Sequence, residues 1–74
     1  MIIQTEDSVY KLEIKNQTFS LERLGYRGEK PSDSYWLPMG GIATGNKMKI
    51  DGDALTLYDG NEIAFIVQKI RSLH

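Results

Sequence analysis

The sequence predicts an all-β fold, a small antiparallel sandwich or barrel that occupies residues 1–74 as a single domain. Apolar and polar residues alternate over most of the chain, which is the period of a half-buried β-strand. Short clusters of Asn, Asp and Gly separate the alternating runs, as expected for hairpin turns. With 74 residues and no Cys, the chain has room for one thin core and no disulfide to reinforce it.

The first predicted element is a hairpin over residues 9–24, with its turn at Asn16-Gln17. Asn-Gln is a weaker turn signal than Asn-Gly, because Gln does not favour a positive φ. A shift by one residue would mix apolar and polar side chains on both faces, so the alternation specifies one register. In that register the facing pairs are Tyr10–Arg23, Leu12–Leu21 and Ile14–Phe19 on the apolar side, and Lys11–Glu22, Glu13–Ser20 and Lys15–Thr18 on the polar side.

Residues 25–45 have a different composition and are expected to form a long loop. They contain five of the seven Gly, both Pro and the only Trp of the chain. Tyr35–Leu37 has the length of a short strand, but Pro38 lacks an amide hydrogen and would confine that strand to an edge. Loops of this length are commonly functional or disordered.

A second alternating region over residues 46–68 predicts a three-stranded meander. A turn at Gly52-Asp53 is preferred to one at Asp51-Gly52, because the second would bury the carboxylate of Asp53. The preferred turn gives the facing pairs Ile50–Leu55, Met48–Leu57, Lys49–Thr56 and Lys47–Tyr58. A three-residue loop at residues 59–61 then gives the pairs Leu57–Ile63 and Leu55–Phe65.

The end of the chain, residues 62–73, fits two structures. Its apolar residues also recur at helical spacing, so a short C-terminal helix is the alternative to a strand. Ile, Phe and Val in close succession favour a strand, which we expect to continue through Gln68. The predicted core comprises Tyr10, Leu12, Ile14, Phe19, Leu21, Met48, Ile50, Leu55, Leu57, Ile63, Phe65 and Val67.

Several kinds of chemistry lack the residues that they need. The single His is residue 74 and there is no Cys, which removes the common zinc sites and a Cys nucleophile, and no Ser lies near a plausible base in the sequence. The Asp and Asn residues at 51–61 lack the spacing of a calcium loop. In residues 40–47 the Lys is one residue too far from the last Gly for a phosphate-binding loop, no Ser or Thr follows it, and the next segment is strand-like instead of helical. We therefore expect no enzyme, no metal site and no cofactor.

The charge and hydropathy of the chain indicate which partners and which cellular location to expect. The net charge of −1 opposes a protein whose main task is to coat nucleic acid. No apolar run approaches the length that spans a bilayer, and the first residues are acidic where an export signal would be apolar. We therefore expect a cytoplasmic protein without a membrane partner.

The predicted loop over residues 25–45, called the aromatic loop below, is the most informative candidate for a binding site. Tyr, Trp and Arg dominate the energetics of protein interfaces, because they give a large contact area at low conformational cost. These residues predict a non-enzymatic binding protein of the inhibitor or adaptor type, a class that includes accessory proteins of viruses and mobile elements. For Trp36, burial in the thin core is an equal alternative. The predicted partner-binding residues are Tyr26, Arg27, Tyr35 and Trp36.

Three alternatives stay open beside this interpretation. Lys47, Lys49 and Tyr58 share one strand face in the predicted register, which is typical of single-stranded nucleic-acid binding by small β-barrels. The loop aromatics together with Arg27 or Lys30 would suit a small anionic ligand such as a nucleotide. A homo-oligomer formed through exposed strand edges is compatible with each of these functions.

Overall fold

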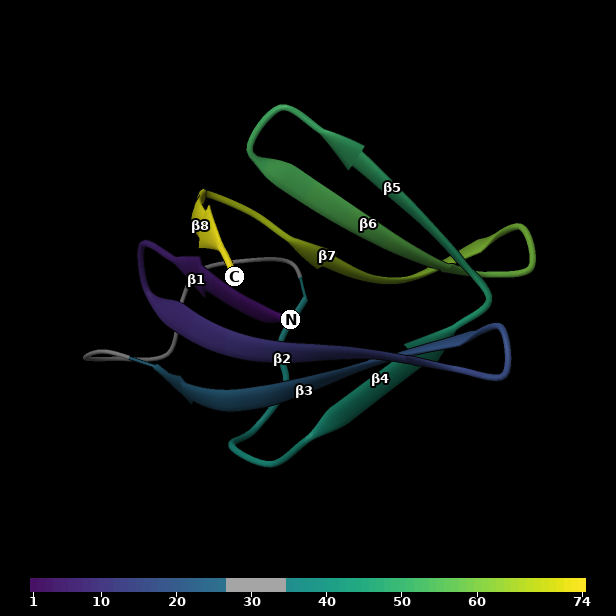
Figure 1. The fold of residues 1–74 in the computed structure, drawn as a ribbon, viewed down its shortest axis with the longest axis horizontal. Helices are drawn as coiled ribbons and strands as arrows, with labels where there is room; N and C mark the ends of the chain where they lie inside the picture. Colours follow the sequence, from purple (N-terminus) through teal and green to yellow (C-terminus); the bar gives the residue numbers. More distant parts are fainter. Residues whose placement is uncertain (27–34) are drawn as a thin grey trace.

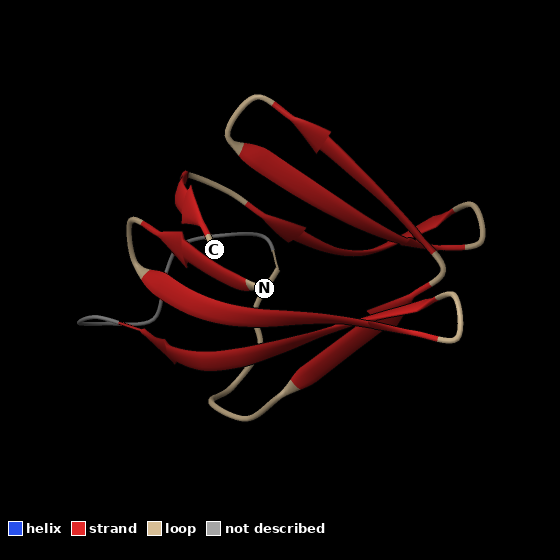
Figure 2. Ribbon diagram, in the orientation of Figure 1, coloured by secondary structure: helices blue, strands red, loops and turns tan. Residues whose placement is uncertain are grey.

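The computed structural model describes residues 1–26 and 35–74, with the side chain of Tyr26 outside the description. Within these ranges the chain forms strands and no helix, which confirms the predicted all-β class (Figures 1 and 2). The strands are β1 (Ile2–Thr5), β2 (Ser8–Lys15), β3 (Thr18–Tyr26), β4 (Ile42–Gly45), β5 (Lys47–Asp51), β6 (Ala54–Asp59), β7 (Glu62–Val67) and β8 (Ile70–Leu73).

Two antiparallel sheets face each other across the core (Figure 1). The larger sheet has the order β4-β3-β2-β1-β8, and the smaller has the order β5-β6-β7. The chain passes from one sheet to the other at two places, between β4 and β5 at Asn46 and between β7 and β8 at residues 68–69. Every ladder joins strands that are consecutive in the sequence except that of β1 with β8, which pairs the first strand with the last, and the two sheets together form a small antiparallel sandwich.

The predicted N-terminal hairpin is confirmed residue for residue from Tyr10 to Arg23. Asn16 and Gln17 both have positive φ values, 52° and 64°, which is the conformation of a type I′ turn. The register of the hairpin therefore determines the turn, although Gln is a poor residue for it. Between Tyr10 and Val9, toward the start of β2, the pairing shifts by one residue. Leu24 is the extra residue of this β-bulge, because Tyr10 faces Arg23 and Val9 faces Gly25.

The predicted register of β5 and β6 is also confirmed, but that of β6 and β7 is wrong. The second turn contains two residues, Gly60 and Asn61, between the facing pair Asp59 and Glu62. A bulge at Ala64 follows, so Leu57 faces Phe65 instead of Ile63, and Leu55 faces Val67 instead of Phe65. A positive φ of 65° at Gly60 permits the tighter turn, and the bulge returns the apolar residues of β7 to the core face.

The core lies between the two sheets. Its buried apolar residues are Ile3, Tyr10, Leu12, Leu21, Leu55, Leu57, Phe65 and Val67, with Phe19 and Met48 packed partly buried against them. Three predicted core residues are instead exposed: Ile14, Ile50 and Ile63. Each lies within two residues of a hairpin turn, near the end of its strand.

Three short strands, β1, β4 and β8, were not among the predicted strands. β1 supplies the fully buried Ile3, and β4 forms inside the segment that was expected to be a loop. Tyr35–Leu37 forms no strand. The strand interpretation of the chain end is confirmed, with β7 ending at Val67 and β8 following it in place of a helix. In the part of the chain that the structure describes, no helix has the length and apolar character needed to cross a membrane.

Candidate functional site

The structure describes the predicted partner-binding residues unequally. Tyr26 is the last residue of β3 and faces Ser8 in the ladder. Arg27, and Lys30 of the anionic-ligand alternative, lie outside the described residues, so their roles stay predictions. Tyr35 and Trp36 are half-buried in the irregular segment that leads to β4.

Trp36 packs on an arginine that is buried in the core. Arg23 is only 1% exposed, and its guanidinium carbon lies 4.2 Å from the Trp36 ring centre and 5.3 Å from the Tyr10 ring centre. One terminal nitrogen donates a hydrogen bond of 3.1 Å to the Tyr10 hydroxyl, and the other donates to the Ser8 hydroxyl. Stacking on aromatic faces and bonding to two hydroxyls compensate for the burial of a planar cation.

Tyr35 packs against the core as well. Its ring meets Phe65 edge to face, with the ring centres 5.9 Å apart, and Phe65 meets Tyr10 at the same distance. Leu37 also packs against the core cluster. Residues 35–37 therefore cover part of the core, and this anchors the exposed residues that follow them, Pro38–Gly40.

An exposed apolar patch lies where this segment enters β4. The amide of Gly40 donates to the Arg23 carbonyl at 2.8 Å, and the Arg23 amide donates to the Gly41 carbonyl at 3.0 Å, so the backbone that follows Met39 is bonded to the residue that precedes Leu24. Ile42 follows at the start of β4. Met39 is 66% exposed and Ile42 is 57% exposed. We call Leu24, Met39 and Ile42 the β4 patch.

A second candidate surface lies on the smaller sheet. Lys47 faces Tyr58 and Lys49 faces Thr56 in the ladder, as the sequence predicts. The Lys47 ammonium nitrogen lies 5.6 Å from the Tyr58 ring centre, within the range of a cation–π contact. The three residues of the nucleic-acid alternative therefore share one sheet face, with acidic residues at the strand ends.

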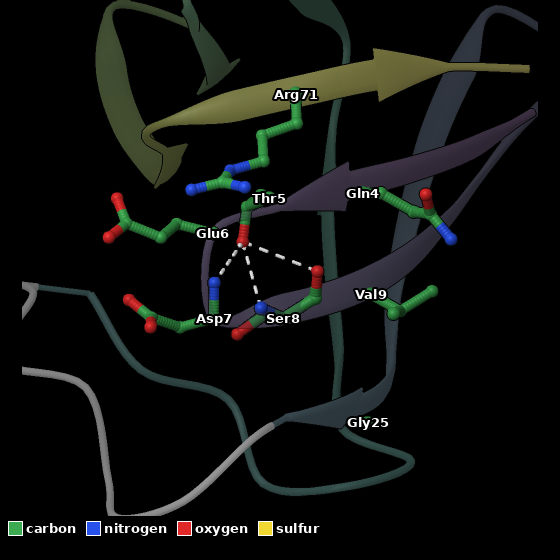
Figure 3. Close-up of a pocket in the computed structure, with 8 residues that line it drawn as sticks. All are labelled: Gln4, Thr5, Glu6, Asp7, Ser8, Val9, Gly25 and Arg71. Atoms are coloured by element: carbon green, nitrogen blue, oxygen red, sulfur yellow. Dashed lines mark hydrogen bonds between the residues drawn. The ribbon is translucent and has the colours of Figure 1, made fainter.

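A cavity of about 480 Å³ lies at the β1–β2 turn and is lined by residues 4–9 with Gly25 and Arg71 (Figure 3). The Thr5 hydroxyl closes the turn, because it accepts hydrogen bonds from the amides of Asp7 and Ser8 at 3.2 and 2.9 Å. The lining carries the carboxylates of Glu6 and Asp7 beside the guanidinium of Arg71. Its charge is mixed, so it does not select an anionic ligand.

One surface ion pair shifts two pKa values. The Lys11 ammonium and the Glu13 carboxylate, both on β2, lie 2.8 Å apart. The hydrogen bond and charge of Glu13 raise the pKa of Lys11, and those of Lys11 lower the pKa of Glu13. Both side chains are exposed, so solvent screens the pair and it adds little to stability.

Comparison of the chain with protein-family models, curated proteins and solved structures gave no match. Within residues 1–26 and 35–74 no three His, Asp or Glu side chains gather as a metal site would require. The β4 patch was missed in the sequence because β4 was expected to be loop. The predicted register already placed Arg23 on the apolar face of the hairpin, opposite Tyr10. That position was the signal in the sequence that this arginine is buried.

Proposed function

We propose that this chain is a non-enzymatic binding protein that acts inside the cell by covering a surface of a partner protein, as inhibitors and adaptors do. The contact is centred on the β4 patch and extends to Tyr35 and Trp36. The observation that carries the proposal is the exposure of Met39 and Ile42, at 66% and 57%, on a segment anchored to the core. Accessory proteins of viruses and mobile elements are a class in which small stand-alone β domains of this kind occur.

Three physical features support a protein partner. Exposed apolar side chains that are close together cost free energy in water and mark interaction sites. Met and aromatic residues are enriched in the centres of protein interfaces. The packing of Trp36 on Arg23 and of Tyr35 on Phe65 holds the backbone before the patch, which reduces the entropy lost on binding.

The test compares two double variants in affinity capture from native lysate. Met39→Ser with Ile42→Ser removes the apolar surface of the patch. Ile14→Ser with Ile63→Ser makes a comparable apolar-to-Ser change at two exposed isoleucines beside hairpin turns, outside the patch. We expect the patch variant to lose partner recovery by roughly tenfold or more, since interface anchors each contribute about 1–2 kcal/mol or more, while the control variant retains it.

Equal recovery of the partner by the two double variants would remove the β4 patch from the interface. A separate Arg27→Ala variant tests the predicted contact outside the described residues, and it should weaken recovery without a change in melting temperature. Capture should resist high salt, because an apolar contact gains little from charge.

Single-stranded nucleic-acid binding is the second candidate, and the packing of Lys47 over Tyr58 favours it. Bases stack on exposed aromatic rings, and nearby ammonium groups neutralise phosphates. This function predicts binding of a fluorescent mixed-sequence oligonucleotide that weakens steeply with salt and is lost in Lys47→Gln with Lys49→Gln. An unchanged anisotropy at low salt would exclude it.

A further inference from the structure

β5 is an edge strand with an open side. In the described part of the chain it pairs only with β6, along its full length from Lys47 to Asp51. The turn between them has two residues, so the closing pair Asp51–Ala54 is a hydrogen-bonded pair. Because hydrogen-bonded and non-hydrogen-bonded positions alternate, the amide and carbonyl groups of Met48 and Ile50 point to the open side.

The side chains of β5 divide between its two faces. Met48 and Ile50 share the face of the core residues Leu55 and Leu57, yet Ile50 is 49% exposed. Lys47, Lys49 and Asp51 lie on the other face and are exposed. Among the residues that the structure describes, none pairs with the outward backbone groups of this strand, and its apolar face is incompletely covered along the same edge, which is the form of surface that a further strand covers.

We propose that the open edge of β5 pairs with β5 of a second copy, antiparallel and centred on Lys49. In this register Met48 faces Ile50 of the second copy, and these residues form the hydrogen-bonded pairs. Lys47 faces Asp51 of the second copy on the other face, and symmetry repeats this attraction. The exposed Ile50 gains an apolar neighbour, and the smaller sheet becomes continuous across the two molecules.

Charge favours a second copy as the occupant, and charge together with the length of paired strand favours one register. A register centred on Met48 would place Lys47 opposite Lys49 twice, which is repulsive. A register centred on Ile50 would also give two attractive pairs, Lys49 with Asp51, but it would leave the edge groups of Met48 facing the Gly52-Asp53 turn, where no strand continues. The register centred on Lys49 pairs the whole strand, with two attractive Lys–Asp pairs against one Lys49–Lys49 pair on the symmetry axis.

The first experiment measures the dimer by sedimentation equilibrium from micromolar to millimolar protein. Lys47→Glu alone, or Asp51→Lys alone, places like charges opposite each other at two symmetric positions, so the dissociation constant should rise roughly tenfold or more. The double variant Lys47→Glu with Asp51→Lys restores opposite charges and should return to near the original value. Lys15→Glu is the matched control for net charge and should have no effect.

The second experiment uses introduced cysteines, because the natural chain has none. Lys49 lies on the symmetry axis, where facing Cα atoms of a non-hydrogen-bonded pair are about 4.5 Å apart and fit a disulfide. Lys49→Cys should therefore form a disulfide dimer under mild oxidation. Lys47→Cys alone should not, but it should cross-link to Asp51→Cys when the two proteins are mixed.

A chain that stays monomeric at millimolar concentration overturns the proposal. A dimer in which Lys47→Glu has no effect, or in which Lys49→Cys cross-links only to Asp51→Cys, overturns the register. The β4 patch variant Met39→Ser with Ile42→Ser should leave the dimer unchanged, so failure of the proposed function and failure of this proposal are distinguishable.

Discussion

At the scale of single residues, Arg23 is the position where an expected apolar face carries a buried cation. It binds the hydroxyls of Ser8 and Tyr10 and packs against Trp36. This arrangement joins the hairpin to the segment that precedes the β4 patch. The position of Trp36 is compatible with both of its interpretations, core and interface, because the indole contacts the buried Arg23 and is itself only half-buried.

Replacing Arg23 by Ala should destabilise the fold and release Trp36. We expect a loss of about 3 kcal/mol in unfolding free energy, because the change leaves a cavity and two hydroxyls without their donor. Urea unfolding measures this loss, and the emission of the single Trp should shift to longer wavelength in the folded state. Unchanged emission with stability within about 0.5 kcal/mol of the original would contradict the packing described.

At the scale of elements, regular alternation and turn residues were sufficient for β2, β3, β5 and β6. Their registers could be derived because a slip exposes apolar side chains, and this penalty is visible in the sequence. β1, β4 and β8 have four residues each and too few alternations to identify. The register of β7 was missed because Ile63, Phe65 and Val67 alternate regularly in the sequence, and this alternation gives no sign of the bulge at Ala64.

The crossing from β4 to β5 depends on the absence of a side chain at Gly45. A Cβ there would collide with the carbonyl oxygen of Tyr58 and with the side chain of Leu57. The adjacent Asn46 amide donates to the same carbonyl at 2.9 Å, which fixes the close approach. The long aromatic segment thus ends in a strand that is held against the opposite sheet.

Gly45→Ala should therefore lower the unfolding free energy by about 1–3 kcal/mol, because a rigid carbonyl cannot move aside without strain. Gly25→Ala is the matched control, since a Cβ there meets nothing within 4 Å. Chemical denaturation of both variants measures the difference. Equal stability of the two would show that the sheets do not approach each other closely at this crossing.

At the scale of the whole molecule, the two proposed surfaces lie on consecutive strands. The β4 patch lies at the start of β4 and the open edge belongs to β5, yet the crossing at Asn46 places the strands in different sheets. One copy can therefore contact a partner protein with one sheet and a second copy with the other. A dimer would present two β4 patches and would strengthen binding to a partner that has two matching sites.

Site-specific photo-cross-linking in native lysate tests most directly whether the β4 patch contacts a partner protein. A photoreactive amino acid at Ile42 reports contacts of the β4 patch, and the same amino acid at Asn61, an exposed turn residue, is the control. If the β4 patch contacts the partner, position 42 gives a discrete adduct with one partner protein and position 61 gives none. The same adducts from both positions, or none from position 42 while the partner is still captured, would contradict it.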